Sequence, residues 1–456
     1  MMAKKPNLWV WSADHSGLPL AKRFQEEGHG GGLALIRPER RQGKLVVPKN
    51  PKEKKDNQER FDYLNKNGNG VIKKVWAEEA LRQVTRKDYC IFDQIYGWQY
   101  GEALYKRGVP VLGGAKVGYT LETERLQTLN MLKKMGYDIP PYKSFGPGSS
   151  KKGIEFLKGV KDNLLYVFKS DNPAVETYVA HENNDELIIK LTAEHKEIDT
   201  DGFLLQEKKP GIELAVETWY YKGKPILANV DLEAKKLYNR RDEPQCGCAF
   251  NLLWLLPVNH PLRVRLNAPM DPFVKQHIGT GLMDISVIYD PHDDKMWVLE
   301  CCGARFAYNA FYTLMALCQM PLGEFFIKYL SGEFKGEIGE KVFGNRFSGS
   351  MWMFNHEHSE DQHIHFAEPE YRPHYWLWDY YKKGGDLLTT GGPRGDSIGI
   401  VTGTSAENPE GAMANVAEYY DKLYMPKKFG RSDIELDDEI NLPLARYHAM
   451  KAAKLI

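Results

Sequence analysis

Three features that mark special classes of protein are missing from the sequence. No apolar run approaches the ~18–20 residues that cross a bilayer as a helix. The first apolar stretch, Leu8–Trp11, is too short for the core of a signal peptide. The six cysteines are too few for a disulfide scaffold and lack Cys-x-x-Cys zinc spacing. We therefore expect a cytoplasmic protein with reduced thiols.

The sequence also has no excess of charge of either sign. Lys and Arg number 61, Asp and Glu number 61, and the formal net charge is +0. A protein that binds a nucleic-acid backbone needs a basic surface, so we do not expect nucleic acid as a partner. The 42% hydrophobic and 27% charged residues are ordinary globular composition. At 456 residues, the chain is long enough for about two to four domains.

The first third of the chain alternates short apolar strands with amphipathic helices. This alternation predicts a parallel sheet with covering helices. The Lys-rich stretch 37–60 interrupts it, and we expect a solvated loop there, with phosphate binding as the alternative. The predicted strands are 7–11, 33–36 and 89–93, and the predicted helices are 18–27, 76–84 and 99–107.

The rest of the chain changes pattern twice. A predicted helix at 121–135 is followed by β-runs with hairpin signals, which indicate an antiparallel α+β module. Asn408-Pro409 is a helix start with Asn as N-cap, and that helix is expected to reach Tyr424. The other predicted strands are 164–169, 176–180, 187–192, 203–206, 212–220, 225–230, 281–289, 295–300, 350–354 and 397–403, and further helices are 308–319 and 322–330.

Single charged residues stand where apolar strands end. Lys169 follows the apolar run Leu164–Phe168, and Glu300 follows Met296–Leu299. Glu213 comes directly after a Pro-Gly turn. A lysine neutralises phosphate oxygens, and carboxylates hold the Mg²⁺ that bridges phosphates. This combination is typical of nucleotide chemistry, although a solvated charge or a structural ion pair remains the plainer interpretation of each residue.

The order of these segments resembles the ATP-grasp superfamily, and within it the family of phosphoribosylamine–glycine ligases. The resemblance is weak through most of the chain and clearest in five segments. The matching segments are Val109–Gly113 with Leu121–Arg125, Tyr166–Asp171, Gln206–Glu213, Val298–Phe306, and Gly399–Thr404 with Phe429–Ile434. Five motifs in the correct order are stronger than any one of them.

The resemblance implies a fold that is α/β and α+β, in three parts. Residues 1–118 would form a Rossmann-like domain that precedes the ATP-grasp module. Residues 119–332 would form that module, with a small lid subdomain inserted at about 142–207. Residues 333–456 would form a small β-rich C-terminal domain.

The resemblance also implies a site for ATP and Mg²⁺ or Mn²⁺. Lys169 and Arg125 would hold phosphates, and Gln206, Glu207 and Glu213 the nucleoside. Glu300 and Asp284 would bind the metal ion, although Asp284 could equally be a buried structural acceptor. Lys169 and Arg305 would be catalytic, with Arg305 beside the transferred phosphate. His15, Lys235, Lys236 and Gly247 would bind substrate.

Several residues depart from the family's pattern. The loop Asn172–Thr177 has no glycine where the family has a Gly-Lys-Gly phosphate loop, and side chains obstruct close approach of the backbone to phosphate. Cys302 stands where the family has a metal-ligating Asn, and a thiol is a poor ligand for Mg²⁺. Ser12–Gly17 and Asp93–Trp98 replace the family's acceptor-site segments.

We therefore expect an ATP-dependent ligase similar to those of purine biosynthesis. It would join glycine to phosphoribosylamine or to a related amine, such as a modified nucleotide or base. The alternative is a pseudoenzyme that keeps the fold and binds a nucleotide or partner without turnover. Either would act on small molecules as a monomer or homodimer. The histidines at 356, 358, 363 and 365 could suggest a metal site, but they also fit a polar strand face and loop, which we favour.

Overall fold

The computed structural model describes residues 5–40, 51–161, 163–171, 177–238, 245–303, 308–339, 342–344, 346–355, 359–392, 397–436 and 442–456. Contacts between Cα atoms divide the chain into two compact units. The first contains Met1–Tyr119, Ala215–Asp284 and Gly303–Ile456, and the second contains Thr120–Leu214 and Ile285–Cys302. The strands β10, β13 and β14 each have residues in both units.

The N-terminal part of the first unit is the predicted parallel sheet. Its strand order is β3-β2-β1-β4-β5, and each neighbouring pair is parallel. The chain starts in the middle at β1, winds to β2 and β3, and then returns to β4 on the other side. In the core, Trp11 stacks on Phe92 with 5.3 Å between ring centroids. The strands are β1 (Leu8–Ser12), β2 (Gly31–Leu35), β3 (Lys74–Trp76), β4 (Tyr89–Phe92) and β5 (Val111–Leu112).

The helices of this part connect the strands. They are α1 (Leu18–Glu26), α2 (Pro51–Lys66), α3 (Ala77–Gln83) and α4 (Trp98–Lys106), followed by α5 (Lys116–Thr123). From β1 the chain continues to β2 and β3 on one side of the sheet, and from β4 it continues to β5 on the other side. The carboxyl ends of the neighbouring strands β1 and β4 therefore form the topological switch point of the sheet. Ligands of open parallel sheets bind at this position.

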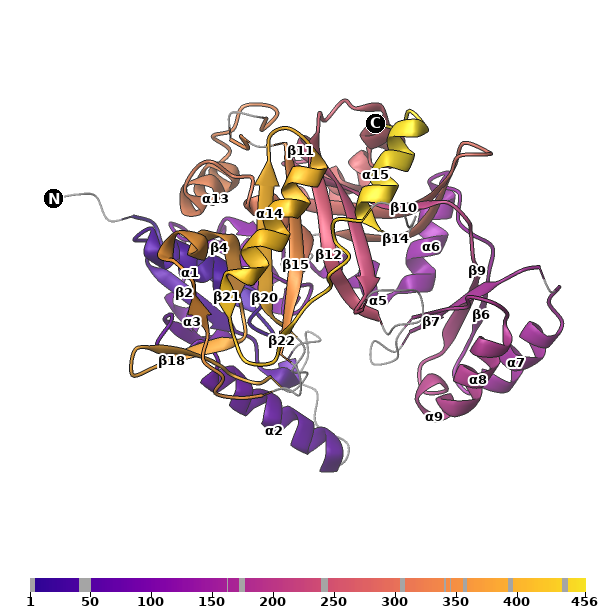
Figure 1. Ribbon diagram of the computed structural model, residues 1–456, viewed down its shortest axis with the longest axis horizontal. Helices are drawn as coiled ribbons and strands as arrows, with labels where there is room; N and C mark the ends of the chain where they lie inside the picture. The colour runs from indigo at the N-terminus through magenta and orange to yellow at the C-terminus, as the bar shows by residue number, and fades with distance from the viewer. Residues whose placement is uncertain are drawn as a thin grey trace. The chain divides into compact units, whose positions relative to one another are not determined.

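The large sheet has the order β14-β13-β10-β11-β12-β15-β20-β17, with β22 paired to β15. The C-terminal strands β15 and β20 extend this sheet through β12, and α14 packs across both of them (Figure 1). The predicted start of α14 is confirmed, since Asn408 Oδ1 accepts a hydrogen bond from the Gly411 N–H at 2.7 Å. The strands are β10 (Ile212–Tyr221), β11 (Lys224–Lys236), β12 (Gln245–Leu256), β13 (Gly281–Asp290), β14 (Lys295–Gly303), β15 (Phe347–Asn355), β17 (Tyr375–Leu377), β20 (Ser397–Ser405) and β22 (Lys428–Phe429).

Further helices and short strands complete the first unit. The helices are α10 (Pro261–Leu266), α11 (Asp271–His277), α12 (Tyr308–Met315), α13 (Leu322–Ser331), α14 (Pro409–Asp421) and α15 (Pro443–Ala452), with a 3-10 helix, η4, at Pro369–His374. Two small antiparallel pairs are β16 (His365–Phe366) with β21 (Leu423–Tyr424), and β18 (Tyr380–Lys383) with β19 (Asp386–Thr389).

The second unit contains a smaller antiparallel sheet of order β6-β9-β7-β8. The rings of Phe145 and Phe203 stack at 4.8 Å beneath α7 and α8, which close one face of this sheet. Its strands are β6 (Tyr142–Phe145), β7 (Tyr166–Ser170), β8 (Tyr178–Val179) and β9 (Phe203–Glu207). Its helices are α6 (Arg125–Lys134), α7 (Ser150–Lys158), α8 (Asp185–Ala193) and α9 (His195–Ile198).

Several sequence predictions of local structure are wrong, and one is the helix expected to reach Tyr424, since α14 ends at Asp421 and Leu423–Tyr424 is the strand β21. The stretch 187–192 is not a strand but part of α8, whose first turn is stabilised by Glu186 accepting backbone N–H bonds from residues 181–183. The helix predicted at 121–135 is two helices, α5 and α6, separated at Glu124. The expected loop 37–60 contains most of α2, a polar helix that buries only Leu64.

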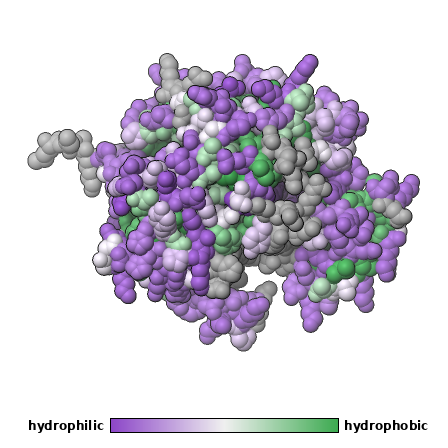
Figure 2. Space-filling view, viewed as in Figure 1, coloured by the Kyte–Doolittle hydropathy of each residue, from purple (hydrophilic) through white to green (hydrophobic). Residues whose placement is uncertain are grey.

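The surface is ordinary for a globular protein. The face shown in Figure 2 is mostly hydrophilic, and the large hydrophobic side chains exposed in the described residues come from separate elements. They are Tyr105, Leu126, Ile189, Tyr238, Val264, Tyr424 and Leu436. None of the described helices combines the length and the apolar character needed to cross a membrane.

Candidate functional site

Lys169 lies near the end of β7 in the second unit. Its side chain is only 7% exposed, because Phe168 and Ser170 on either side are buried within the small sheet. The Lys169 Nζ donates a hydrogen bond to the backbone carbonyl of Leu299 on β14 at 3.4 Å. A buried ammonium group is unfavourable unless polar groups or an anionic ligand surround it. The fold therefore places this lysine beside the strand that carries Glu300.

Glu300 and Arg125 meet at the same strand. Arg125 is the first residue of α6, and its Nη1 lies 3.9 Å from Glu300 Oε2. The Arg125 side chain is 24% exposed and the Glu300 side chain 43%, so both keep contact with solvent. Glu300 lies inside β14, which continues to Gly303, whereas the sequence predicted that it ends the strand. Lys169, Arg125 and Glu300 are thus neighbours, although they lie far apart in the sequence.

Gln206 and Glu207 lie at the end of β9, next to β7. The register pairs Val167 with Gln206 and Tyr166 with Glu207. Gln206 is 1% exposed, and its side-chain amide nitrogen has no hydrogen-bond partner in the described part of the chain. An unsatisfied buried amide costs free energy, so this group is suited to a ligand that offers a hydrogen-bonding edge.

The Pro-Gly turn after β9 brings Glu213 close to β13. Gly211 has φ +134°, and a Cβ at this position would lie 2.2 Å from the Tyr289 carbonyl oxygen. Only glycine can make this close approach without displacing the backbone. Nearby, Glu207 forms an ion pair with Lys209, whose Nζ lies 4.5 Å from the centre of the Trp297 ring. The turn thus holds Glu213, the second residue of β10, at a constrained position.

The predicted metal ligands do not form a complete protein site. Groups of three or more His, Cys, Asp or Glu side chains that could hold a metal ion are absent from the described residues. Asp284 is a partly buried residue of β13, and the Cys302 side chain is 8% exposed on β14. Mg²⁺ needs only one or two carboxylates when phosphates supply further oxygens, so Glu300 fits such an ion. Arg305 lies outside the described residues, as do His356, His358 and most of the loop Asn172–Thr177.

His15 lies at the switch point of the parallel sheet, in the first unit. It is completely buried, has φ 69°, and contacts Tyr63 edge-on with 5.7 Å between ring centroids. Neither ring nitrogen meets hydrogen-bond geometry with any described residue. Burial, and then the nearby positive charge of Lys74, lower the pKa of His15 to about 3. His15 is therefore neutral at pH 7.

Asp93 directly follows β4; the sequence placed it in a segment that replaces an acceptor-site segment but gave it no role of its own. Its Oδ2 accepts hydrogen bonds from the Ser16 hydroxyl at 2.8 Å and from the Gly17 N–H at 2.7 Å. Gly17 is the N-cap of α1, so the protein's own carboxyl occupies the place where a helix start would bind an anion. Burial, and then Asp14, raise the pKa of Asp93. The switch-point rule, applied to the residues after β1 and β4, could have identified it.

The other predicted substrate residues lie on the large sheet. Lys235 Nζ is 3.8 Å from Glu233 Oε2, and the backbone carbonyl of Lys236 accepts a hydrogen bond from Arg431. Gly247 adopts φ +89° at the start of β12, with open space where a side chain would lie. The thiol of Cys248 is buried and donates to Asn251 Oδ1 at 2.8 Å. Lys235, Lys236, Gly247 and Cys248 lie on β11 and β12, whereas His15 lies between β1 and α1.

Several solved structures are similar to this chain over most of its length. The phosphoribosylamine–glycine ligase of Thermotoga maritima is 17% identical with TM-score 0.65, and the match covers 94% of this chain and 99% of that chain. Biotin carboxylase of Campylobacter jejuni is 11% identical with TM-score 0.60, covering 94% of both chains. The L-amino acid ligase of Bacillus licheniformis is 14% identical with TM-score 0.54, covering 93% and 99%.

Comparison with protein-family models and with curated protein sequences gives no match. At such low identity the structural similarity establishes the architecture, and not the substrates. The chain has the ATP-grasp fold, with the mixed α/β and α+β architecture that the sequence predicted.

Proposed function

We propose that this chain, built on the ATP-grasp fold, is an ATP-dependent ligase that joins a carboxylate to an amine. The observation that carries the proposal is the cluster in the second unit, where Lys169 contacts the strand of Glu300 and Arg125 lies 3.9 Å from the Glu300 carboxylate. Cations and a carboxylate side by side suit a phosphate chain with its metal ion. The similar biotin carboxylase structure contains an ATP analogue, which is consistent with this proposal.

Each residue of the cluster has a proposed role. Lys169 and Arg125 bind phosphate oxygens, and Glu300 holds Mg²⁺ or Mn²⁺. Gln206, Glu207 and Glu213 bind the nucleoside, and the unsatisfied amide of Gln206 supports this assignment. A metal ion bound at Glu300 would neutralise charge on the phosphates. Asp284 is the proposed second metal ligand, and Arg305 is the proposed catalytic partner of Lys169.

The proposed reaction has two balanced steps. A carboxylate oxygen attacks the γ-phosphorus of ATP, the bond to the bridging oxygen breaks, and ADP leaves. The amine nitrogen then attacks the acyl carbon of the resulting acyl phosphate, phosphate leaves, and the nitrogen loses a proton. The residues contribute mainly by holding the reactants and neutralising charge, which is how most of such a barrier is lowered.

The acceptor is proposed to be an amine related to phosphoribosylamine rather than phosphoribosylamine itself. Asp93 already occupies the Ser16 hydroxyl and the Gly17 N–H, which are donors a ribose phosphate would need at the start of α1. His15, Lys235, Lys236 and Gly247 remain proposed substrate contacts, and glycine the proposed carboxylate.

The remaining parts of the proposal concern the protein as a whole. We propose three domains, at 1–118, 119–332 and 333–456, in a cytoplasmic monomer or homodimer. Its proposed partners are small-molecule substrates of a reaction similar to those of purine biosynthesis.

ADP release tests the proposed function. The purified protein is incubated with Mg-ATP, glycine and, one at a time, phosphoribosylamine and amines on a modified base or nucleotide, and ADP is measured. We expect ADP release that requires both glycine and an amine, with an amide product of matching mass. Binding of Mg-ATP without ADP release for any amine would contradict the ligase and indicate a pseudoenzyme. No rise in thermal stability with Mg-ATP would contradict nucleotide binding itself.

A further inference from the structure

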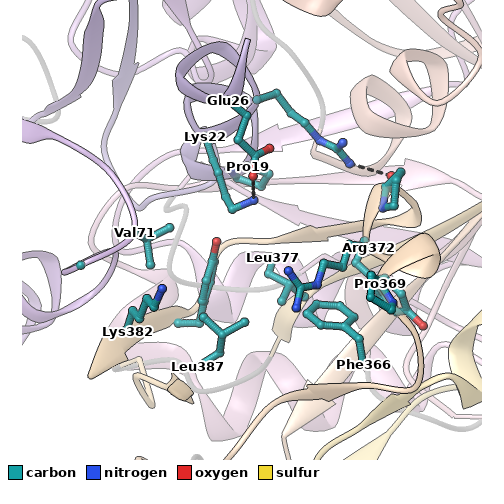
Figure 3. Close-up of a pocket in the computed structure, with 15 residues that line it drawn as sticks. Pro19, Lys22, Glu26, Val71, Phe366, Pro369, Arg372, Leu377, Lys382 and Leu387 are labelled. Carbon is teal, nitrogen blue, oxygen red and sulfur yellow. Dashed lines mark hydrogen bonds and ion pairs between the residues drawn. The ribbon is translucent and has the colours of Figure 1, made fainter. Parts of the chain in front are cut away.

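A cavity of about 460 Å³ lies within the first unit, away from the residues discussed above. One wall is a single face of α1, where Pro19, Lys22, Arg23 and Glu26 recur at helical spacing. The opposite wall comes from the C-terminal part of the chain, with Phe366, η4 and β17–β19 (Figure 3). Its volume falls in the range of small-molecule sites, about 300–1,000 Å³.

The charges around this cavity are unbalanced. Four lining residues are cationic (Lys22, Arg23, Arg372 and Lys382), and Glu26 is the acidic residue among them. Lys22 forms an ion pair with Glu26 on the same helix. Within the described part of the chain, the other three cations have no carboxylate within ion-pair distance. The cavity therefore carries an excess of about three positive charges.

Two of the cations are held in place by neutral groups. Arg23 donates to the Pro373 carbonyl at 2.6 Å, and its guanidinium lies 4.9 Å from the Trp376 ring. The Arg372 guanidinium lies 5.5 Å from the Phe366 ring. These contacts involve neutral partners and leave most N–H donors of the two guanidinium groups unused by the described residues. Partial burial also lowers the pKa of Arg23, a cost that a bound anion would relieve.

Figure 3 shows the arrangement of the charged ends. Arg372 and Lys382 belong to different elements and their nitrogen ends turn toward the middle of the view, while Lys22 comes from α1. The floor contains the buried rings of Tyr375 and Tyr380 together with Leu377. Cations at the rim above an apolar and aromatic floor suit a ligand with one anionic end and one organic end.

We propose that this cavity binds a small phosphomonoester, with the phosphate dianion at Arg372, Lys382 and Arg23 and the organic group against the aromatic floor. Guanidinium groups bind phosphate through paired N–H donors, and lysine adds a point charge. A dianion would offset most of the excess charge, whereas a neutral or cationic ligand would not. The site is independent of the ATP-dependent reaction proposed above.

Ribose 5-phosphate and inorganic phosphate are the probes for this site. Binding to the full chain is measured by titration calorimetry without ATP, at low ionic strength, with ribose as the uncharged control. We expect ribose 5-phosphate to bind and ribose not to bind. Inorganic phosphate binding as tightly as ribose 5-phosphate would support the anion site with phosphate alone as its ligand. Absence of binding by both phosphates would overturn the proposal.

Variants localise the binding. Arg372→Gln with Lys382→Gln should weaken ribose 5-phosphate binding at least tenfold and leave Mg-ATP binding unchanged. The matched control, Arg82→Gln with Lys87→Gln, removes the same charges from exposed positions outside the cavity. Equal weakening in both pairs would overturn the proposal, because it would indicate a general charge effect. If the Arg372 and Lys382 double variant misfolds, Glu26→Gln tests the site instead. This change removes the ion-pair partner of Lys22 and should tighten ribose 5-phosphate binding. Unchanged or weaker binding would count against the site.

Discussion

Two polar clusters, one in each unit, differ in how much solvent reaches them. The Arg125–Glu300 pair of the second unit keeps 24% and 43% of its side-chain surface exposed. At the switch point of the first unit, His15 is completely buried and Asp93 is 8% exposed. Burial pushes the pKa of His15 down and that of Asp93 up, so each favours its neutral form. Arg125 and Glu300 therefore remain available to a charged ligand, whereas burial favours the neutral forms of His15 and Asp93.

The largest expected effect on activity follows from removing the side chain of Lys169 in the second unit. Lys169→Ala should reduce ADP release by at least about 100-fold, since removing one donor to a developing charge costs that much. Steady-state ADP release, with folding checked by circular dichroism, measures it. Lys196→Ala on α9, an exposed lysine of the same unit, is the control. Equal activity of both variants would remove Lys169 from the site.

Glu300→Gln tests whether the exposed carboxylate holds the metal ion. The amide keeps the size of the side chain and removes its charge, so the Mg²⁺ concentration for half-maximal ADP release should rise by about tenfold or more. Manganese should shift in parallel. A variant with the magnesium dependence of the original protein would show that Glu300 acts only as the partner of Arg125.

His15→Asn tests the enclosed cluster through pH. A native pKa of about 3 against the usual value of 6.5 for histidine means that the unfolded state binds the proton more readily. Stability due to His15 is therefore fully present above pH 6.5 and is lost as the pH falls towards 3, by about 2 kcal/mol at pH 5. Asparagine tolerates the positive φ of this position. We expect the variant to lose less stability between pH 7 and pH 5 in urea unfolding, whereas His363→Asn, an exposed control, should not change this difference.

Asp93→Asn should give an effect of the opposite sign and at least similar size, because burial raises the pKa of Asp93 to about 8. A raised native pKa means that the folded protein holds a proton that the unfolded chain releases. The contribution is fully present below about pH 4 and is lost as the pH rises through the native value. The variant should therefore lose less stability than the original protein between pH 5 and pH 8, measured by urea unfolding. An unchanged slope would show that Asp93 is ionised in the folded state.

Local patterns predicted the elements wherever one physical signal dominated. The alternation of apolar strands and helices anticipated β1, α1, β4 and α4, because each buries one face or stripe against the parallel sheet. The cap Asn408-Pro409 anticipated the start of α14. The apolar run 187–192 is ambiguous by itself, since Leu and Ile suit a buried helix face as well as a strand. The polar helix α2 buries too little to leave a periodic signal.

The candidate site was predicted residue by residue but not as an arrangement. Lys169 and Gln206 were singled out, yet nothing local indicates that they lie on paired strands of one small sheet. Asp93 was named only as part of an altered segment, because its role depends on Ser16 and Gly17 from another segment. The cavity beside α1 could not be predicted from the sequence, because Arg372 and Lys382 are more than 300 positions away from that helix.

The residue order alone was enough for the class of fold and for which charged residues to examine, because periodicity, capping and strand-end charges are local properties. Tertiary structure alone decided which charges keep solvent, which are neutralised by burial, and which come together from distant segments. The reason is that desolvation and Coulomb energies depend on three-dimensional surroundings. The zero net charge is therefore a sum of unlike regions. The second unit has the mixed pair Arg125–Glu300, and the first unit has the buried, neutral His15 and a cavity lined mainly by cations.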